Sequence, residues 1–498
     1  MSAGLWRDEG STYFDIAGSF SRAWSNVQHY EWSPPLYFML EHAWTSAAGT
    51  TEIIMRMPSL MFGTATILVV YACGLRLGAR LTAVVAAMMA AAAPLAVSVG
   101  TEARAYGLTM FLSAFVLYAF LSVDCAAMPR RRWLFATALA LCATLLVCTH
   151  FTGYVVVATV TIAALVRMLR RPDAAGQQLA SAMVLASLLA LLFAGSFLHA
   201  AGQQMAWHVR SQGPLVAVID DNLGVFAPFG AMSVQFDRVV EIGAAIWLVR
   251  LARLRFASPS AAATLLLLFV VVAGVGVGVA RSLPNGRHLA VYAPFAWLFV
   301  ASMLTAFVSW LRGPNHSMFG RIVRPVAALA VLYVLVGGVA AYRRTYATIR
   351  KPGSGAEQLI TTLRARIRQP VLLIACPDYL GPGLAYYARG SREAVHGVVT
   401  WNAPWFYSDD PADWRAPHVI DRLIARIDRD AHQQHAAIAL AVDWNVPNTN
   451  GINFNGALDL AKREMRMHRV LWRREFPGTR EAIELIVLAS ASRTSRQR

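Results

Sequence analysis

Long apolar runs alternate with short polar segments through roughly the first two thirds of the chain. The runs are about 17–22 residues long, the length that an α-helix needs to cross a bilayer core of about 30 Å. We predict spans at residues 57–76, 81–99, 105–123, 133–148, 151–167, 179–198, 239–254, 261–280, 289–311 and 324–342. The pattern therefore predicts a polytopic α-helical membrane protein with about ten spans.

The N-terminal segment, residues 1–55, mixes polar and apolar positions. Two stretches within it, residues 11–24 and 34–48, read as short amphipathic helices that are neither long nor apolar enough to span a bilayer. Residues 56–342 form the predicted transmembrane domain.

The C-terminal segment, residues 343–498, has a different pattern. Short apolar stretches with flanking turn residues, "PVLLIAC", "AAIALAVDW" and "EAIELIVLA", are typical of buried strands. "GAEQLITTLRARI" and "HVIDRLIARIDRDAHQQ" have the helical period. We predict a water-soluble α/β domain here, whose aromatic stretch at residues 401–414 suits either sugar stacking or a packed loop.

Composition agrees with a membrane protein. The 498 residues are 57% hydrophobic and 15% charged, whereas soluble domains average about 25% charged. The net charge is +17, and nearly all the basic residues are arginine, since the chain has only two lysines, Lys351 and Lys462. Many arginines occupy short loops between spans, so a nucleic-acid partner is not predicted. The five cysteines form no metal-binding or disulfide pattern.

The arginine-rich loops predict the orientation. By the positive-inside rule, alternate loops are cytoplasmic. Those loops hold Arg76, Arg80, Arg130, Arg131, Arg132, Arg167, Arg170, Arg171, Arg250, Arg253, Arg255, Arg312, Arg321 and Arg324. The C-terminal domain is then outside. Arg104 and Arg287 fall on the outer side, where the rule does not call for arginine.

An even number of spans places both termini outside. A polar N-terminal segment does not cross a membrane without help, so we expect one further transmembrane helix upstream of the given sequence.

Carboxylates occur at two places that this topology puts on the outer face. Asp8 and Glu9 are adjacent; such pairs also occur in solvated loops, and this alternative stays open. In "TEARAYG", Glu102, Arg104 and Tyr106 follow Pro94, which is expected to kink or end the preceding span. Ionisable residues beside membrane helices favour a functional site, although a snorkelling arginine with an acidic neighbour is the structural alternative.

Two further polar groups lie on the same face. Arg287 and His288 begin the ninth predicted span, and His150 lies at the tip of the "THFTG" hairpin. A histidine at such a position is more often a structural hydrogen-bonding group than a ligand. A carboxylate can deprotonate a hydroxyl, and guanidinium groups bind phosphate by charge and by paired hydrogen bonds. The set favours a substrate with a phosphate head and a lipid tail.

The motifs, in order, resemble a known family. "LWRDEGSTYFDIA", "SPPLYFMLEHAW", "RMPSLMFGTATILVVYACGLRLG", "EARAYGL" and "RHLAVYAP" are similar to segments of the bacterial polyprenyl-phosphate-sugar-dependent glycosyltransferases. These include the protein O-mannosyltransferases and the lipid A aminoarabinose transferases, which have the C-type glycosyltransferase fold. The chain departs from the pattern at Ser33, where many members have histidine.

The resemblance implies an inverting transfer of a hexose or pentose from a polyprenyl monophosphate to an acceptor hydroxyl. The donor would be presented at the outer face of a bacterial inner membrane, and the acceptor would be a lipid, glycan or protein. Asp8 would be the catalytic base, with Glu9 and Glu102 in support. Arg104, Arg287 and Tyr106 would bind the phosphate, with His150 and His288 supporting them. No cofactor is expected; a divalent cation stays open, although no ligand cluster in the sequence supports one.

Two other classes stay open. A transporter or flippase for a lipid-linked or anionic substrate would also have many spans and charges near the membrane, although it more often shows inverted repeats. A membrane scaffold would have the spans without the grouping of acids and arginines.

Overall fold

The computed structural model describes residues 4–31, 33–78, 80–206, 266–267, 269–274, 276, 286–312, 343, 346–347, 353–389, 398–402, 419–445 and 455–489. Contacts divide the chain into two compact units. Unit 1 comprises Met1–Asn26, Thr50–Ile53 and Thr348–Arg498, and unit 2 comprises Val27–Gly49 and Ile54–Ala347. The predicted N-terminal segment 1–55 is thus shared between the two.

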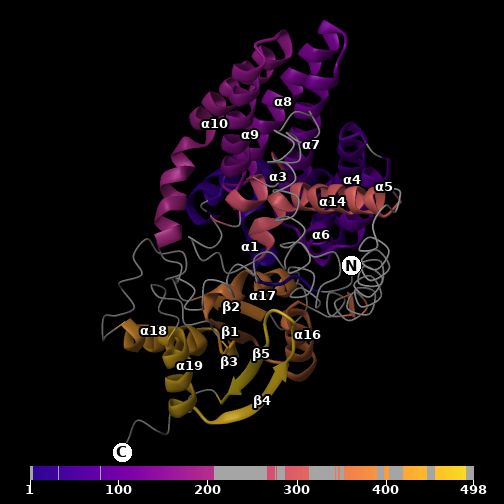
Figure 1. The fold of residues 1–498 in the computed structure, drawn as a ribbon. Helices are drawn as coiled ribbons and strands as arrows, with labels where there is room; N and C mark the ends of the chain where they lie inside the picture. The colour runs from indigo at the N-terminus through magenta and orange to yellow at the C-terminus, as the bar shows by residue number, and fades with distance from the viewer. Residues whose placement is uncertain are drawn as a thin grey trace, which may run out of the picture. The chain divides into compact units, whose positions relative to one another are not determined.

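Unit 2 is helical in its described residues (Figure 1). Its elements are η1 (Val27–Glu31), α3 (Leu36–Ala48), α4 (Glu52–Arg76, which begins in unit 1), α5 (Arg80–Ala92), α6 (Pro94–Gly100), α7 (Tyr106–Cys125), α8 (Pro129–Thr149), α9 (Gly153–Arg170), α10 (Ala174–Ala206), η2 (Gly286–Tyr292) and α14 (Ala293–Arg312). Helix α7 packs against α8, and α10 packs against both α8 and α9. Helix α14 packs against α5, where the Thr82 hydroxyl donates to Thr305 Oγ1 at 2.9 Å.

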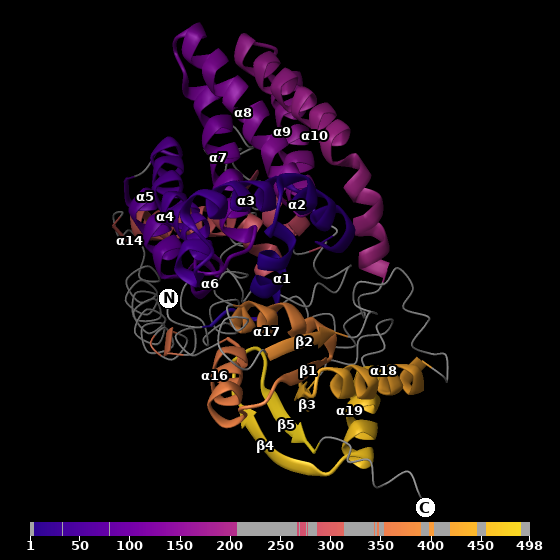
Figure 2. The ribbon, with the colours of Figure 1, turned by 180° about the vertical axis from the view of Figure 1, so that it is seen from behind.

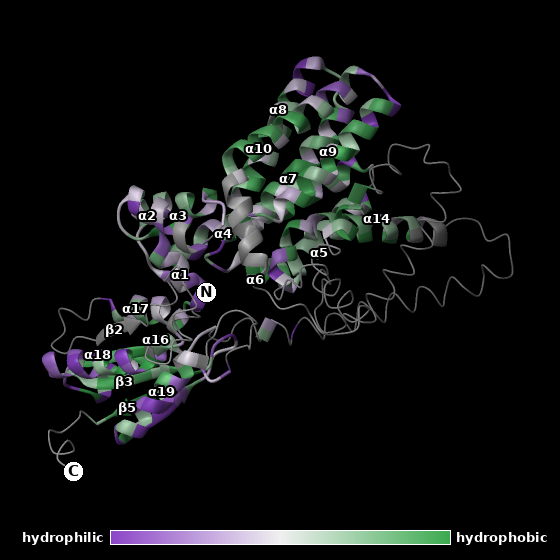
Figure 3. Ribbon diagram, turned by 90° about the vertical axis from the view of Figure 1, so that its left-hand side faces the viewer, coloured by the Kyte–Doolittle hydropathy of each residue, from purple (hydrophilic) through white to green (hydrophobic). Residues whose placement is uncertain are grey.

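Six helices in the described part of the chain are long and apolar enough to cross a membrane, and a bent pair brings the number to seven. Their surfaces expose large apolar side chains, such as Leu169 at 77% and Leu192 at 74%. Figure 3 shows the hydrophobic colour along α7 to α10. An apolar surface of this kind is stable in lipid and not in water. The protein is a polytopic helical membrane protein.

Most predicted spans within the described residues correspond to helices. Six match α4, α7, α8, α9, α10 and the η2–α14 segment. The spans at 239–254 and 324–342 lie outside the described residues, and that at 261–280 lies largely outside them.

The predicted span at 81–99 is bent. It is two helices, α5 and α6, bent by 58°. The break lies at Ala93, whose extended backbone precedes Pro94 at the start of α6. Proline has no N–H to continue the hydrogen bonding and disfavours a helical conformation in the residue before it. The bend that Pro94 was expected to cause therefore occurs, and it directs the chain toward the loop that holds Glu102 and Arg104.

A close helix contact fixes the beginning of α7. A Cβ atom on Gly107 would lie 2.9 Å from the carbonyl oxygen of Ser59 on α4. The backbone of α7 can approach α4 this closely because Gly107 has no side chain. The Ser59 hydroxyl also donates to the carbonyl oxygen of Arg104 at 3.0 Å. The loop before α7 is thereby held against α4.

Unit 1 contains a five-stranded sheet with strand order β2-β1-β3-β5-β4. The strands are β1 (Val371–Cys376), β2 (Val398–Asn402), β3 (Ala437–Val442), β4 (Val470–Phe476) and β5 (Ile483–Leu488). The helices are α1 (Arg7–Ile16), α2 (Phe20–Asn26), α16 (Ala356–Arg366), α17 (Gly381–Ala388), α18 (Val419–Gln433) and α19 (Asn455–Met467), with the short η3 (Asp378–Leu380). Strand β1 pairs parallel with β2 and β3, whereas β5 pairs antiparallel with β3 and β4.

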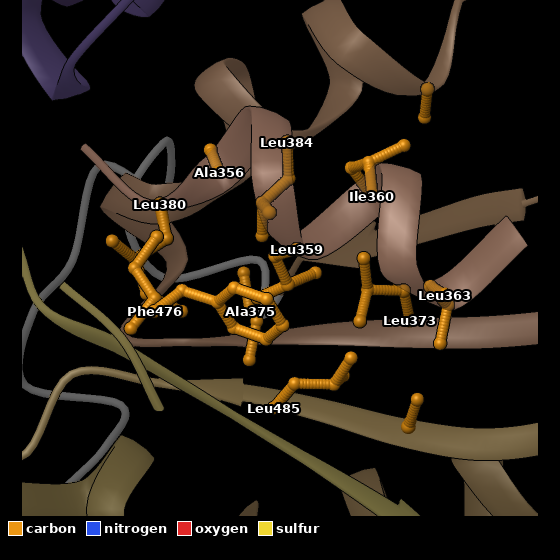
Figure 4. Packing of buried hydrophobic residues seen from close by; sticks show 14 of the residues in the cluster. Ala356, Leu359, Ile360, Leu363, Leu373, Ala375, Leu380, Leu384, Phe476 and Leu485 are labelled. Atoms are coloured by element: carbon orange, nitrogen blue, oxygen red, sulfur yellow. The ribbon is translucent and has the colours of Figure 1, made fainter. Parts of the chain in front are cut away.

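Helices cover both faces of this sheet (Figure 2). One face packs Leu373 and Leu485 against α16 and α17, as Figure 4 shows. The other packs Leu372 and Ile438 against α18 and α19. Successive strand residues point to opposite faces, so a strand covered on both faces is apolar throughout. All six residues of β1 and of β3 are buried.

The three strands expected from continuous apolar stretches are β1, β3 and β5, and the two expected helices are α16 and α18. Strands β2 and β4 and helices α17 and α19 were not predicted. Strand β4, "VLWRREF", is an edge strand with five exposed residues. An edge strand pairs with another strand on one side only, so its residues are exposed and can be charged. The charged side chains of β4 therefore interrupt the apolar pattern by which a buried strand is predicted.

Candidate active site

The adjacent carboxylates begin helix α1 in unit 1. Asp8 and Glu9 lie in the first turn of that helix. Carboxylates are stabilised there by the partial positive charge of the helix N-terminus. The Glu9 side chain is fully buried and accepts from the Trp6 backbone N–H at 3.4 Å. The Asp8 side chain is 16% exposed and accepts from Arg7 Nε at 3.0 Å. Neither acid is a solvated loop residue.

Arg7 links this turn to the end of the chain. Its backbone N–H donates to Glu481 Oε1 at 3.0 Å, and its guanidinium lies 4.8 Å from the centre of the Tyr379 ring. Burial raises the pKa of Glu481 to about 8, because the effect of burial, with Asp8 adding to it, exceeds the opposing effect of Arg7. Sequence reasoning missed Arg7 and Glu481, since 474 positions separate them along the chain.

Helix α1 is held in place by α17. A Cβ atom on Gly10 would lie 2.6 Å from the backbone nitrogen of Gly383, so the two backbones are in close contact. Tyr13 and Tyr386 pack edge to face at 4.9 Å, and the Arg389 guanidinium lies 3.6 Å from the centre of the Tyr386 ring. These contacts give the Asp8 turn a rigid support within unit 1.

In unit 2, Arg104 forms a two-point ion pair with Glu31. Its Nη1 donates to Glu31 Oε1, and its Nη2 donates to Glu31 Oε2 at 3.0 Å. The two side chains are 13% and 8% exposed. The guanidinium also lies 5.6 Å from the centre of the Phe38 ring. Glu31 was not predicted as a site residue, although it stands just before the position where the sequence departs from the family pattern.

The second arginine pairs with Glu102. Arg287 Nη1 lies 3.6 Å from Glu102 Oε2, and the side chains are 11% and 6% exposed. The Ser98 hydroxyl donates to the other Glu102 oxygen at 2.8 Å. Among the described residues, Glu102 thus lies beside Arg287.

Three rings lie beside these ion pairs. The Arg287 guanidinium is 5.3 Å from the centre of the Tyr106 ring. Tyr106 OH lies 3.4 Å from His288 Nδ1, and the His150 ring centre is 5.3 Å from that of Tyr106 and 5.6 Å from that of His288. His150 lies between α8 and α9, as predicted. Burial, followed by Arg104 and Arg287, lowers the pKa of His150 to about 3, so its ring is neutral.

The structure thus groups most of the predicted residues. Those that gather in unit 2 are Glu102, Arg104, Tyr106, His150, Arg287 and His288. Asp8 and Glu9 belong to unit 1. Within the described residues, the unit 2 cluster holds two largely buried guanidinium groups, with a carboxylate beside each, next to an uncharged histidine. A guanidinium group has five N–H donors, so such a cluster can bind an anion through the N–H groups that the carboxylates do not occupy.

The fold is similar to that of known membrane transferases. ArnT from Cupriavidus metallidurans in the apo state matches with a TM-score of 0.57 at 12% identity, over 97% of this chain and 93% of that one. ArnT bound to undecaprenyl phosphate matches with a TM-score of 0.55 at 13% identity, over 97% and 94% of the chains. The apo oligosaccharyltransferase of Archaeoglobus fulgidus matches with a TM-score of 0.53 at 13% identity, over 99% of this chain and 71% of that one.

No protein-family model matches the sequence, and no curated protein matches it either. The structural neighbours share the C-type glycosyltransferase fold, and this chain has the same fold.

Proposed function

We propose that this protein is a glycosyltransferase that moves a sugar from a polyprenyl monophosphate to an acceptor hydroxyl. The observation that carries the proposal is the pair of buried arginine–glutamate contacts beside Tyr106, His150 and His288. The fold supports it, since ArnT has been solved with undecaprenyl phosphate, and AglB from Archaeoglobus fulgidus with an inhibitory peptide and a dolichol-phosphate.

Arg104 and Arg287 bind the donor phosphate in this proposal. The bound donor is a phosphodiester with one negative charge, and the phosphate gains charge as the sugar departs. Preorganised cations therefore stabilise the transition state more than the ground state. Glu31 and Glu102 hold the two guanidinium groups in place before the donor binds. Tyr106, beside Arg287, is a third phosphate-binding group, and a neutral His150 adds no competing charge.

Asp8 is the proposed base. The acceptor oxygen attacks the anomeric carbon, its proton passes to the Asp8 carboxylate, and the bond from carbon to phosphate oxygen breaks with its electron pair on the phosphate. A single displacement of this kind inverts the anomeric centre. Arg7 donates to Asp8, which lies in the first turn of α1. Glu9 and Glu102 have supporting roles.

The reaction is proposed to occur at the outer face of a bacterial inner membrane, with residues 343–498 on the same side as the donor. The arginine pattern of the loops supports this orientation. The sugar is a hexose or pentose, and the acceptor is a lipid, a glycan or a protein.

The test is release of polyprenyl phosphate. Purified protein in proteoliposomes receives a panel of polyprenyl-phosphate sugars and an acceptor extract of bacterial envelopes. We expect one donor to yield polyprenyl phosphate and a glycosylated product, and we expect Asp8→Asn and Arg287→Ala to lower the rate of both at least about 100-fold. Movement of intact donor across the bilayer without product would instead identify a flippase and overturn the proposal.

A further inference from the structure

A cluster of ligand-type side chains occurs in unit 1, at the contact between α18 and α19. Asp428 on α18 faces Glu464 on α19 and His468, which directly follows α19, and one ligand atom from each lies within 4.8 Å of the others. His468 Nε2 is 3.1 Å from Asp428 Oδ1 and 3.5 Å from Glu464 Oε2. No local sequence pattern indicates this cluster, because Asp428 is 40 positions from His468.

Glu464 gives the second observation. Its side chain is fully buried, and neither of its carboxylate oxygens has a hydrogen-bond partner among the described residues. A buried carboxylate in that condition is strongly unfavourable unless a cation or a proton accompanies it. A cation held between the three side chains would meet this requirement.

We propose that Asp428, Glu464 and His468 bind one divalent transition-metal ion of the zinc class, which joins α18 to α19. The ligand set is one imidazole nitrogen and two carboxylates, which suits zinc and its neighbours better than calcium or magnesium. Metal–ligand bonds of about 2.1 Å at tetrahedral angles separate the ligand atoms by about 3.4 Å. The distances of 3.1 and 3.5 Å to His468 Nε2 agree with that separation.

The surroundings favour an ion that enters from solvent. His468 directly follows the end of α19, and its backbone N–H donates to the carbonyl oxygen of Glu464 at 3.0 Å, so the two side chains lie on the same side of the helix end. Asp428 is 25% exposed and gives the ion a path from water, whereas Glu464 and His468 line the interior. The two carboxylate charges equal the charge of a divalent ion, so the bound cluster would be neutral. This site is independent of the proposed glycosyltransferase activity.

The experiment uses the full chain in detergent with an affinity tag that contains no histidine. After chelator treatment and dialysis against zinc, elemental analysis should give one tightly bound zinc per chain. Cobalt should give the visible absorption bands of a low-coordinate site. Loss of a partner that merely orients a metal ligand lowers affinity about 10–100-fold, so loss of a ligand should lower it at least 100-fold. We expect His468→Asn to lower zinc affinity by this factor. We expect the same of Glu464→Gln, which keeps the shape of the side chain.

His432→Asn on α18 and Asp459→Asn on α19 are matched controls, since both positions are exposed and should leave binding unchanged. Circular dichroism checks that each variant is folded. Absence of tight zinc binding, or equal binding by the parent and Glu464→Gln, would overturn the proposal.

Discussion

Replacing Arg104 by alanine tests whether this arginine acts on the substrate or only balances Glu31. The substitution leaves the Glu31 carboxylate, 8% exposed, without its two-point partner. Removing one member of a buried ion pair costs about 3–5 kcal/mol of stability. If Arg104 also stabilises the leaving phosphate, turnover should fall about 10²–10³-fold, as on removal of one preorganised donor. The single variant mixes the two effects.

A double variant separates these effects. Glu31→Gln with Arg104→Met removes both charges and keeps similar side-chain volumes. Exchange of a whole buried ion pair for uncharged side chains is often neutral or stabilising. We therefore expect its thermal midpoint in detergent to return close to the parental value. Its turnover should stay about 10²–10³-fold low, because the phosphate has lost the Arg104 cation and keeps only Arg287 of the two proposed arginines.

The assay pairs thermal unfolding with release of polyprenyl phosphate under saturating donor. Arg167→Ala is the control, since its pairs with Asp124 and Asp173 are partly exposed, with the two carboxylates 34% and 53% exposed. Exposed pairs contribute about 0–1 kcal/mol, and this variant should transfer sugar at the parental rate. Recovery of turnover together with stability in the double variant would refute the phosphate role and leave Arg104 as a structural residue.

Three further predictions concern unit 1 and the orientation. Asp8→Asn should lower turnover about 10²–10⁴-fold with little change in donor binding, as expected for loss of a general base; near-normal turnover would exclude Asp8 from that role. Glu481 titrates near 4.5 when unfolded and near 8 when folded, so the folded state retains the proton and stability should fall as pH rises between these values. Thermal midpoints from pH 5 to 9 should show this slope, and Glu481→Gln should flatten it; an unchanged slope in the variant would contradict the assignment. In spheroplasts of a cysteine-free background, Ser19→Cys should react with a membrane-impermeant thiol reagent and Arg131→Cys should not, and the reverse pattern would invert the proposed topology.

Local chemistry accounts for the parts that the sequence alone determined. Apolar runs predict membrane helices because backbone groups in lipid must pair within their own segment. The strands β1 and β3 could be predicted because each is buried on both faces, and a strand in that position consists of apolar residues throughout. Pro94 predicts the break between α5 and α6 because proline has no N–H to donate to the preceding helical turn. The group Glu102, Arg104, Tyr106, Arg287 and His288 could be named because charges near membrane helices are unfavourable without a role.

Tertiary structure alone decided which residue meets which. From the sequence, Glu102 has only a supporting role near the arginines, whereas packing pairs it with Arg287 and pairs Glu31 with Arg104. Arg7 and Glu481, or Asp428 and His468, lie far apart along the chain and carry no shared local pattern. Edge strand β4 was not predicted because most of its residues are exposed to solvent and therefore show no apolar pattern. Pairing over such distances depends on how helices and strands pack, and a periodic pattern records only the face that each element buries.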